Sequence, residues 1–312
     1  MRLAVPAHWC TIDTMHASPD ACLARALASL DGLSVGDAFG ERLFGRPHRI
    51  AARAVPDDDA WRWTDDTAMA LTIVEALAAT GAVDADALAT GFARRYEAEP
   101  WRGYGGTAHS ILTEIADGVP WRVAAQAPYG GQGSKGNGSA MRVAPLGAYF
   151  AHDLDRAAAA AAVSAAPTHR HREGEAGAIA IAVAAAMAAR MAAGAEPASG
   201  ARLLDEVYQR TPTSLTRDGI ELAMRTPMTA PVPQVAARLG NGAWVLCEDT
   251  VPLCVWLAAR HLGAFEEAMW QTASAVGDLD TNCAIVGGIL AAGGAAPPAT
   301  WLARREPLPS LG

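Results

Sequence analysis

The chain has 312 residues, of which 51% are hydrophobic and only 19% charged, so it is not an intrinsically disordered protein and is long enough to bury a large core. A formal net charge of −8 argues against nonspecific nucleic-acid binding and against a basic helix that binds a membrane surface. Alanine dominates the apolar residues. Because alanine is the best helix former and a poor strand former, the composition favours an all-α fold.

Helical patterns follow one another along the whole chain. We expect helices at residues 21–39, 66–79, 84–97, 107–116, 154–165, 175–193, 203–210, 214–224, 232–239, 249–260, 265–275 and 281–292. Several begin near Asp, Ser or Thr, the usual N-cap residues. Alternation typical of a strand occurs only weakly, at 243–247. Since no long linker or internal repeat interrupts the pattern, we predict a single domain over residues 1–312.

The cellular location can be inferred from the first 30 residues, the longest apolar stretch and the cysteines. The first 30 residues lack the pattern of a secretory signal, and residues 176–189 are too short and too rich in alanine for a membrane span. The cysteines Cys10, Cys22, Cys247, Cys254 and Cys283 include no C-x-x-C pair. They predict buried reduced thiols, neither a disulfide framework nor a zinc site. We therefore expect a cytoplasmic protein that does not bind membranes.

A first acidic cluster, Thr64-Asp65-Asp66-Thr67, begins the expected helix at 66–79. One interpretation is N-capping, because Thr and Asp at a helix start bind free backbone N–H groups and suit the helix dipole. Capping explains one or two of these residues. Two adjacent aspartates flanked by two threonines exceed what capping needs, so a ligand site is the competing interpretation.

A second cluster, Asp278-Leu279-Asp280-Thr281, begins the last long helix. Alone it is a weak signal. If both clusters converge, four carboxylates would repel one another severely without cations, and two divalent ions would balance their charge. Threonine hydroxyls would add neutral oxygens. Such all-oxygen ligation favours Mg²⁺, Mn²⁺ or Ca²⁺ over Zn²⁺.

Two further segments are suited to an anionic ligand. Residues 130–142 form a glycine-rich loop with polar and basic side chains, whose N–H groups could bind phosphate. Its spacing is not that of a Walker or Rossmann loop; the alternative is a flexible connection. Residues 167–173 place two histidines and two arginines at a helix entry, with plain solvated charge as the alternative.

Together these segments resemble the ADP-ribosylglycohydrolase family. The matching segments are Gly32-Leu33-Ser34-Val35-Gly36-Asp37-Ala38-Phe39-Gly40 (G-x-x-x-G-D-A-x-G), Thr64-Asp65-Asp66-Thr67 with Met69, Gly136-Asn137-Gly138-Ser139-Ala140-Met141-Arg142 with Pro145 and Gly147, Thr168-His169, Gly177-Ala178-Ile179-Ala180 and Asp278-Leu279-Asp280-Thr281. They occur in the family's order over about residues 30–293. No single motif is decisive, but their combination is highly specific.

The resemblance implies an all-α orthogonal helical bundle with a dinuclear Mg²⁺ or Mn²⁺ site. The implied metal ligands are Thr64, Asp65, Asp66, Asp278, Asp280 and Thr281. The residues implied to bind ADP-ribose are Tyr104, Gly105, Gly106, Gly136, Asn137, Gly138, Ser139, Ala140, Met141, Arg142 and His169.

One position departs from the family pattern. Many members carry a glutamate four residues after the last glycine of the first motif, where this chain has Phe44; its acid, Glu41, stands directly after Gly40. Glu41 either serves the same role from a shifted backbone or is a surface glutamate at a helix end. Asp37 is either a structural helix residue or a ligand.

The resulting hypothesis is a metal-dependent hydrolase that cleaves the bond between ADP-ribose and an acceptor, with Glu41, Asp66 and Asp280 as catalytic residues. The partner is an ADP-ribosylated protein or small molecule, and a nucleic acid only if it is itself ADP-ribosylated. Arginine, serine, a base and a small molecule are all open as acceptors. The alternatives are hydrolysis of another ADP-ribosyl or nucleoside-type conjugate, and a catalytically silent ADP-ribose-binding or structural module.

Overall fold

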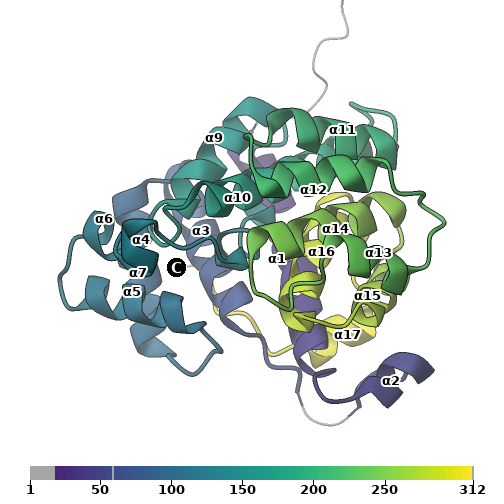
Figure 1. Ribbon diagram of the computed structural model, residues 1–312, viewed down its shortest axis with the longest axis horizontal. Helices are drawn as coiled ribbons and strands as arrows, with labels where there is room; N and C mark the ends of the chain where they lie inside the picture. Colours follow the sequence, from purple (N-terminus) through teal and green to yellow (C-terminus); the bar gives the residue numbers. More distant parts are fainter. Residues whose placement is uncertain (1–17, 58–59, 311–312) are drawn as a thin grey trace, which may run out of the picture.

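The computed structural model describes residues 18–57 and 60–310, and these residues form helices and loops but no strand (Figure 1). All twelve expected helices are present. They are α1 (Pro19–Glu41), α3 (Asp65–Thr80), α4 (Ala85–Ala98), α5 (Gly106–Ala116), α9 (Leu154–Ala165), α10 (Arg172–Ala192), α11 (Gly200–Arg210), α12 (Leu215–Met224), α13 (Val232–Leu239), α14 (Cys247–Arg260), α15 (Phe265–Ser274) and α16 (Leu279–Ala292). The expected all-α fold is confirmed.

Six short helices were not expected from the sequence. They are α2 (Pro47–Ala52), α6 (Trp121–Ala124), α7 (Pro128–Gly131), the 3-10 turn η1 (Asn137–Ser139), α8 (Ala144–Tyr149) and α17 (Ala299–Arg304). The prediction of a strand at 243–247 was wrong. Leu246 makes only an isolated bridge with Gly136, and α14 begins at Cys247.

The most extensive helix contact joins α1 to α16, near the two ends of the described chain. Three glycines of α1 make it possible. A Cβ on Gly36 would lie 2.1 Å from the carbonyl oxygen of Cys283, and one on Gly40 would lie 2.6 Å from the Cα of Asp280. Any side chain there would hold the backbones apart. The end of α1, with Asp37 and Glu41, therefore lies beside the start of α16, with Asp280.

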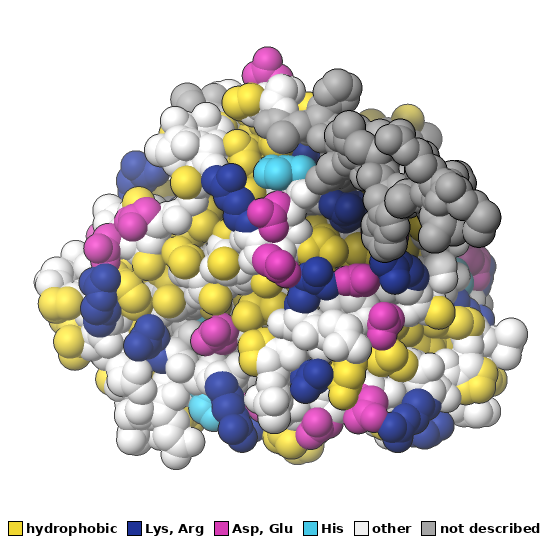
Figure 2. All heavy atoms as spheres, turned by 90° about the horizontal axis from the view of Figure 1, so that it is seen from above, with side chains coloured by type: hydrophobic (Ala, Val, Ile, Leu, Met, Phe, Trp, Pro, Cys, Tyr) yellow, Lys and Arg dark blue, Asp and Glu magenta, His cyan; other side chains and the backbone are white. Residues whose placement is uncertain are grey.

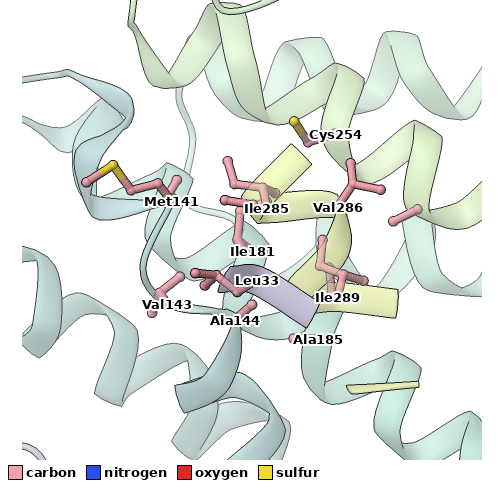
Figure 3. Packing of buried hydrophobic residues seen from close by; sticks show 14 of the residues in the cluster. Leu33, Met141, Val143, Ala144, Ile181, Ala185, Cys254, Ile285, Val286 and Ile289 are labelled. Atoms are coloured by element: carbon pink, nitrogen blue, oxygen red, sulfur yellow. The ribbon is translucent and has the colours of Figure 1, made fainter. Parts of the chain in front are cut away.

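The core is one continuous cluster around α1, α8, α10, α14 and α16. Figure 3 shows Leu33 of α1, Ile181 of α10 and Ile285 and Ile289 of α16 packed together. A smaller cluster joins α4, α5 and α6, which lie with α7 at the left of Figure 1, while α12 to α15 lie at the right.

Helix α10 corrects one expectation. It has 21 residues and is long and apolar enough to cross a membrane, so the view that this stretch is too short was wrong. However, 83% of its apolar window is buried against other helices, chiefly α8, α9 and α11. Burial on nearly all sides explains why its sequence is apolar all round.

The described cysteines Cys22, Cys247, Cys254 and Cys283 are buried free thiols, as expected. Cys10 lies outside the described residues.

Candidate active site

Both acidic clusters contribute to one cavity of about 780 Å³, here called the main cavity. Its walls are formed by Asp65, Asp66, Met69, Gly103, residues 105–108, Tyr129, residues 132–138, Met141, Arg142, Thr168, His169, residues 171–173, Leu215, residues 244–246, Asp278, Asp280 and Thr281. The close contact of α1 with α16, together with the contact of α1 with α3, brings the starts of α3 and α16 together here. The sequence alone could not establish this convergence.

N-capping does not explain the acidic clusters. Neither Thr64 at the N-cap of α3 nor Asp278 at that of α16 makes a side-chain cap hydrogen bond. Instead Asp37, reaching across from α1, accepts hydrogen bonds from the backbone N–H groups of Thr64 (2.9 Å) and Thr67 (3.1 Å) and from the Thr67 hydroxyl (2.5 Å). Asp37 thus caps α3 from another helix, and Asp65 and Asp66 remain available to the cavity.

The clustered carboxylates strongly perturb one another. Burial, with repulsion from Asp37 next, raises the pKa of Asp65 to about 7. Burial and then repulsion from Asp37 and Asp280 hold the pKa of Asp66 well above its usual range, and burial with Asp278 does the same for Asp280. Carboxylates clustered in this way ionise readily only when cations offset their repulsion, and carboxylate ligands bind a metal in the ionised form.

The donor atoms fit a divalent ion. Asp66 Oδ1 is buried and has no hydrogen-bond partner among the described residues, so one carboxylate oxygen lacks the partner that a bound cation would provide. The neighbouring polar atoms are carboxylate and hydroxyl oxygens, the ligands of hard cations. Among the described residues, no three Asp, Glu, His or Cys side chains are already arranged as a metal site.

The glycine-rich loop at 130–142 contacts the acidic wall, which is the part of the main cavity formed by Asp65, Asp66, Asp278 and Asp280. The Asn137 amide donates to Asp278 Oδ2 (2.8 Å) and to the Thr250 hydroxyl (3.0 Å). One N–H group therefore holds Asp278 of the second acidic cluster in place, and the other ties the loop to α14. Gly136 and Gly138 lie against the His169 ring, where a Cβ on Gly138 would come within 3.1 Å of it.

Not every residue expected to bind ADP-ribose lines the main cavity. Gly105, Gly106, Gly136, Asn137, Gly138, Met141, Arg142 and His169 do. Ser139 is buried behind the loop, where its hydroxyl donates to the Gly174 carbonyl (2.7 Å), and Ala140 is buried beside it. Tyr104 packs its ring edge-on against Tyr96 and is not part of the cavity wall.

Glu41 and Thr64 line a second cavity, of about 690 Å³, which shares Asp280 and Gly103 with the main cavity. Glu41 is the last residue of α1 and is exposed on its outer side, yet partial burial raises its pKa. Phe44 is 43% exposed and lies outside both cavity walls. The acid of this region is thus Glu41, one residue from Gly40.

The sequence model of ADP-ribosylglycohydrolases matches residues 18–310. The chain belongs to the ADP-ribosylglycohydrolase family. It is accordingly an enzyme of that class, an ADP-ribosylglycohydrolase, in agreement with the resemblance of its motifs.

Relatives support this assignment to the ADP-ribosylglycohydrolases. An uncharacterized protein of Archaeoglobus fulgidus is 29% identical over 87% of this chain and 88% of its own length. Human ADP-ribosylhydrolase ARH3 is 40% identical, but over 28% of this chain and 25% of its own. ADP-ribosylarginine hydrolase Tri1 of Pseudomonas putida is 28% identical over 44% of this chain and 39% of its own. A solved structure titled ADP-ribosylglycohydrolase-related protein complex superposes with a TM-score of 0.63 at 25% identity, covering 92% and 94% of the two chains.

Sequence reasoning missed Glu173 in this ADP-ribosylglycohydrolase. This fully buried carboxylate lines the main cavity and accepts hydrogen bonds from the backbone N–H groups of Leu215 (2.8 Å) and Thr216 (2.9 Å) at the start of α12. Its only signal was its place as the last residue of the histidine-arginine segment at 167–173. In that segment His171 caps α10, because its Nδ1 accepts from the Glu173 N–H (3.1 Å).

The tryptophans divide between core and cavities. Trp61, Trp63 and Trp121 are buried, whereas Trp101 (69% exposed) lines the second cavity and Trp244 (76% exposed) the main cavity. Tyr129, also exposed, lines the main cavity and hydrogen-bonds the Thr107 hydroxyl (2.9 Å). Such exposed aromatic rings offer flat surfaces for a ring-containing ligand.

Proposed function

We propose that this ADP-ribosylglycohydrolase hydrolyses the glycosidic bond between ADP-ribose and an acceptor, with two divalent ions, Mg²⁺ or Mn²⁺, at the acidic cluster. The observation that carries the proposal is that Asp65, Asp66, Asp278 and Asp280 face one cavity together with the glycine loop. A cation-binding wall beside a glycine-rich loop that a ligand can approach closely suits a ligand with a diphosphate and hydroxyl-bearing sugars.

The diphosphate has a favourable position near the start of α5. Gly105, Gly106 and Thr107 line the main cavity there. The N-cap residue, Gly105, has no side chain that could cap the helix. The first N–H groups of this helix can therefore donate to an anion, and the helix dipole favours negative charge. This local attraction operates despite the net charge of −8.

The metal ligands in this proposal are Thr64, Asp65, Asp66, Asp278, Asp280 and Thr281, with the unpartnered Oδ1 of Asp66 as supporting observation. When bound, the ions would supply positive charge that balances the carboxylates and Lewis acidity for the reaction. Thr64 is oriented by its own hydrogen bonds, since its hydroxyl lies 2.9 Å from Asp37 and 3.2 Å from Asp66.

Glu41 is proposed to accept the proton of the water that attacks the glycosidic bond. It lies where the second cavity meets Asp280, and its raised pKa suits a base that is to be protonated during the reaction. Asp66 and Asp280 line the main cavity, where they would hold the reacting end of the sugar in place. The second cavity then accommodates the acceptor that leaves.

The substrate is proposed to be an ADP-ribosylated protein or small molecule. The names of two relatives, ADP-ribosylhydrolase ARH3 and ADP-ribosylarginine hydrolase Tri1, support ADP-ribosylated substrates of this kind, and each relative matches less than half of this chain. We also propose a cytoplasmic location, from the cysteine pattern.

A panel of substrates with defined linkages tests the proposal: ADP-ribosyl-arginine, ADP-ribosyl-serine, an ADP-ribosylated base and a small-molecule conjugate. ADP-ribose release is measured with Mg²⁺ or Mn²⁺ and with a chelator. Metal-dependent release from at least one linkage is expected. Tight ADP-ribose binding with no release from any linkage would instead identify a silent binding module.

A further inference from the structure

Three side chains in the wall of the main cavity form a hydrogen-bonded series: Arg142, Thr168 and His169. Arg142 is fully buried, and its guanidinium donates to the Ser164 carbonyl (2.7 Å) and to the Thr168 hydroxyl (3.0 Å). The Thr168 hydroxyl lies 2.8 Å from His169 Nδ1. A guanidinium can only donate, so the direction of the first bond is fixed.

The direction of the second bond follows from counting donors and acceptors. Thr168 is 1% exposed, and within the described residues the hydrogen-bond partners of its hydroxyl are Arg142 and His169 Nδ1. The hydroxyl accepts from Arg142. If it also accepted from an Nδ1–H group, its own proton would be buried without an acceptor, which is costly. The hydroxyl therefore donates to Nδ1.

His169 Nδ1 is then the acceptor of a neutral imidazole, and the ring proton is on Nε2. Burial, and next the positive charge of Arg142, lowers the pKa of His169 to about 3, in keeping with a neutral ring. The ring is part of the cavity wall, and no described residue hydrogen-bonds its Nε2. Gly136 and Gly138 leave this edge open, because a Cβ on either would lie 3.5 or 3.3 Å from Nε2.

We propose that Arg142 and Thr168 are positioning residues that fix His169 as a neutral Nε2–H donor toward an oxygen of the bound ligand. A charged imidazolium would lose its proton near neutral pH, whereas this donor is constant across that range. That the oxygen belongs to ADP-ribose rests on the proposed function. The protonation pattern of the ring does not.

The tautomer is tested directly by ¹⁵N NMR on the full chain with labelled histidine and no ligand, with His169→Asn used to assign the signal. The expected spectrum shows a protonated Nε2 and an unprotonated Nδ1, unchanged from pH 8 to pH 5. A proton on Nδ1, or titration near the usual histidine pKa of about 6.5, would overturn the proposal. Because no ligand is present, this result stands even if the proposed activity fails.

Variants of Thr168 test the positioning role. Thr168→Val removes the hydroxyl at nearly constant volume, and Thr168→Ser retains it. ADP-ribose Kd is expected to rise roughly tenfold in Thr168→Val and to stay near wild type in Thr168→Ser, and the Nδ1 signal, which loses its hydrogen bond, is expected to shift only in the first. If ADP-ribose binding weakened equally in both variants and the His169 spectrum stayed unchanged, the positioning of His169 by Thr168 would be overturned. If wild type binds no ADP-ribose, the proposed function fails, and the two variants' spectra alone decide whether Thr168 positions His169.

Discussion

At the scale of single residues, the site depends on buried carboxylates that cap helices other than their own. Asp37 of α1 binds the start of α3, and Glu173 of α10 binds the start of α12. Each satisfies backbone N–H groups that would otherwise lack partners. Each also fixes a helix start that faces the main cavity, so stability and ligand binding are coupled there.

Glu173→Gln tests this coupling. An amide retains one acceptor oxygen and directs an NH₂ group at backbone donors, so at least one buried N–H loses its partner. We expect a loss of about 2 kcal/mol in the free energy of unfolding and weaker ADP-ribose binding, measured by chemical denaturation and calorimetry.

Glu175→Gln is the matched control, because Glu175 is exposed two residues along the same helix. Its effect should be within about 0.5 kcal/mol. Equal effects of the two substitutions would refute the capping role of Glu173.

At the scale of elements, the contact of α1 with α16 positions the acidic clusters. Gly36→Ala should destabilise the protein by about 3 kcal/mol, even though alanine favours helix, because its Cβ would overlap the Cys283 carbonyl. The separation of the helices should also lower metal affinity. Chemical denaturation and a metal titration measure both effects.

Gly106→Ala is the control, since a Cβ at this position in α5 meets nothing within 4 Å. Its stability should be unchanged or raised by up to about 1 kcal/mol. If Gly36→Ala behaved like Gly106→Ala, the close contact would not be what holds the clusters together.

The twelve longer helices were predictable from their alanine-rich helical patterns and the N-cap residues near several of their starts, even where, as in α10, the helix is apolar all round. Short helices such as α6 (four residues) and α17 (six residues) carry too little pattern and form through tertiary packing, for example of the buried Trp301. Motifs identified the residues of the acidic wall. The trans-capping by Asp37 and Glu173 and the second cavity depend on contacts between distant segments, which local patterns do not encode.

At the scale of the whole molecule, the net charge of −8 has different consequences at the surface and in the main cavity. On the face shown in Figure 2, basic and acidic side chains alternate around hydrophobic patches. The unbalanced acids that matter most are buried in the acidic wall, where the pKa of Asp37 is raised to about 6 by burial and that of Asp65 to about 7.

This arrangement predicts how stability depends on pH. Unfolded aspartates titrate near pH 4, so between about pH 4 and 7 the metal-free folded state binds more protons than the unfolded state, and its stability falls as pH rises. The lowered pKa of His169 has the opposite sign, since its stabilisation is lost as pH falls from about 6.5 toward 3, but it is one group against several. With a chelator, Tm should fall by about 4 °C or more from pH 5 to pH 8.

Divalent ions should remove or reverse that slope, because they bind the ionised carboxylates and stabilise most at high pH. Thermal denaturation at several pH values, with chelator and with Mn²⁺, provides the comparison. A metal-free Tm that rises over this pH range would contradict the account of the acidic wall.

The most direct test of the central claim is the rate of ADP-ribose release by Asp280→Asn. This substitution relieves repulsion in the acidic wall, so the fold should persist while kcat falls by roughly 100-fold or more. Asp117→Asn, at an exposed position, should retain wild-type turnover. Near-wild-type turnover by a folded Asp280→Asn protein would show that the acidic wall is not the catalytic centre.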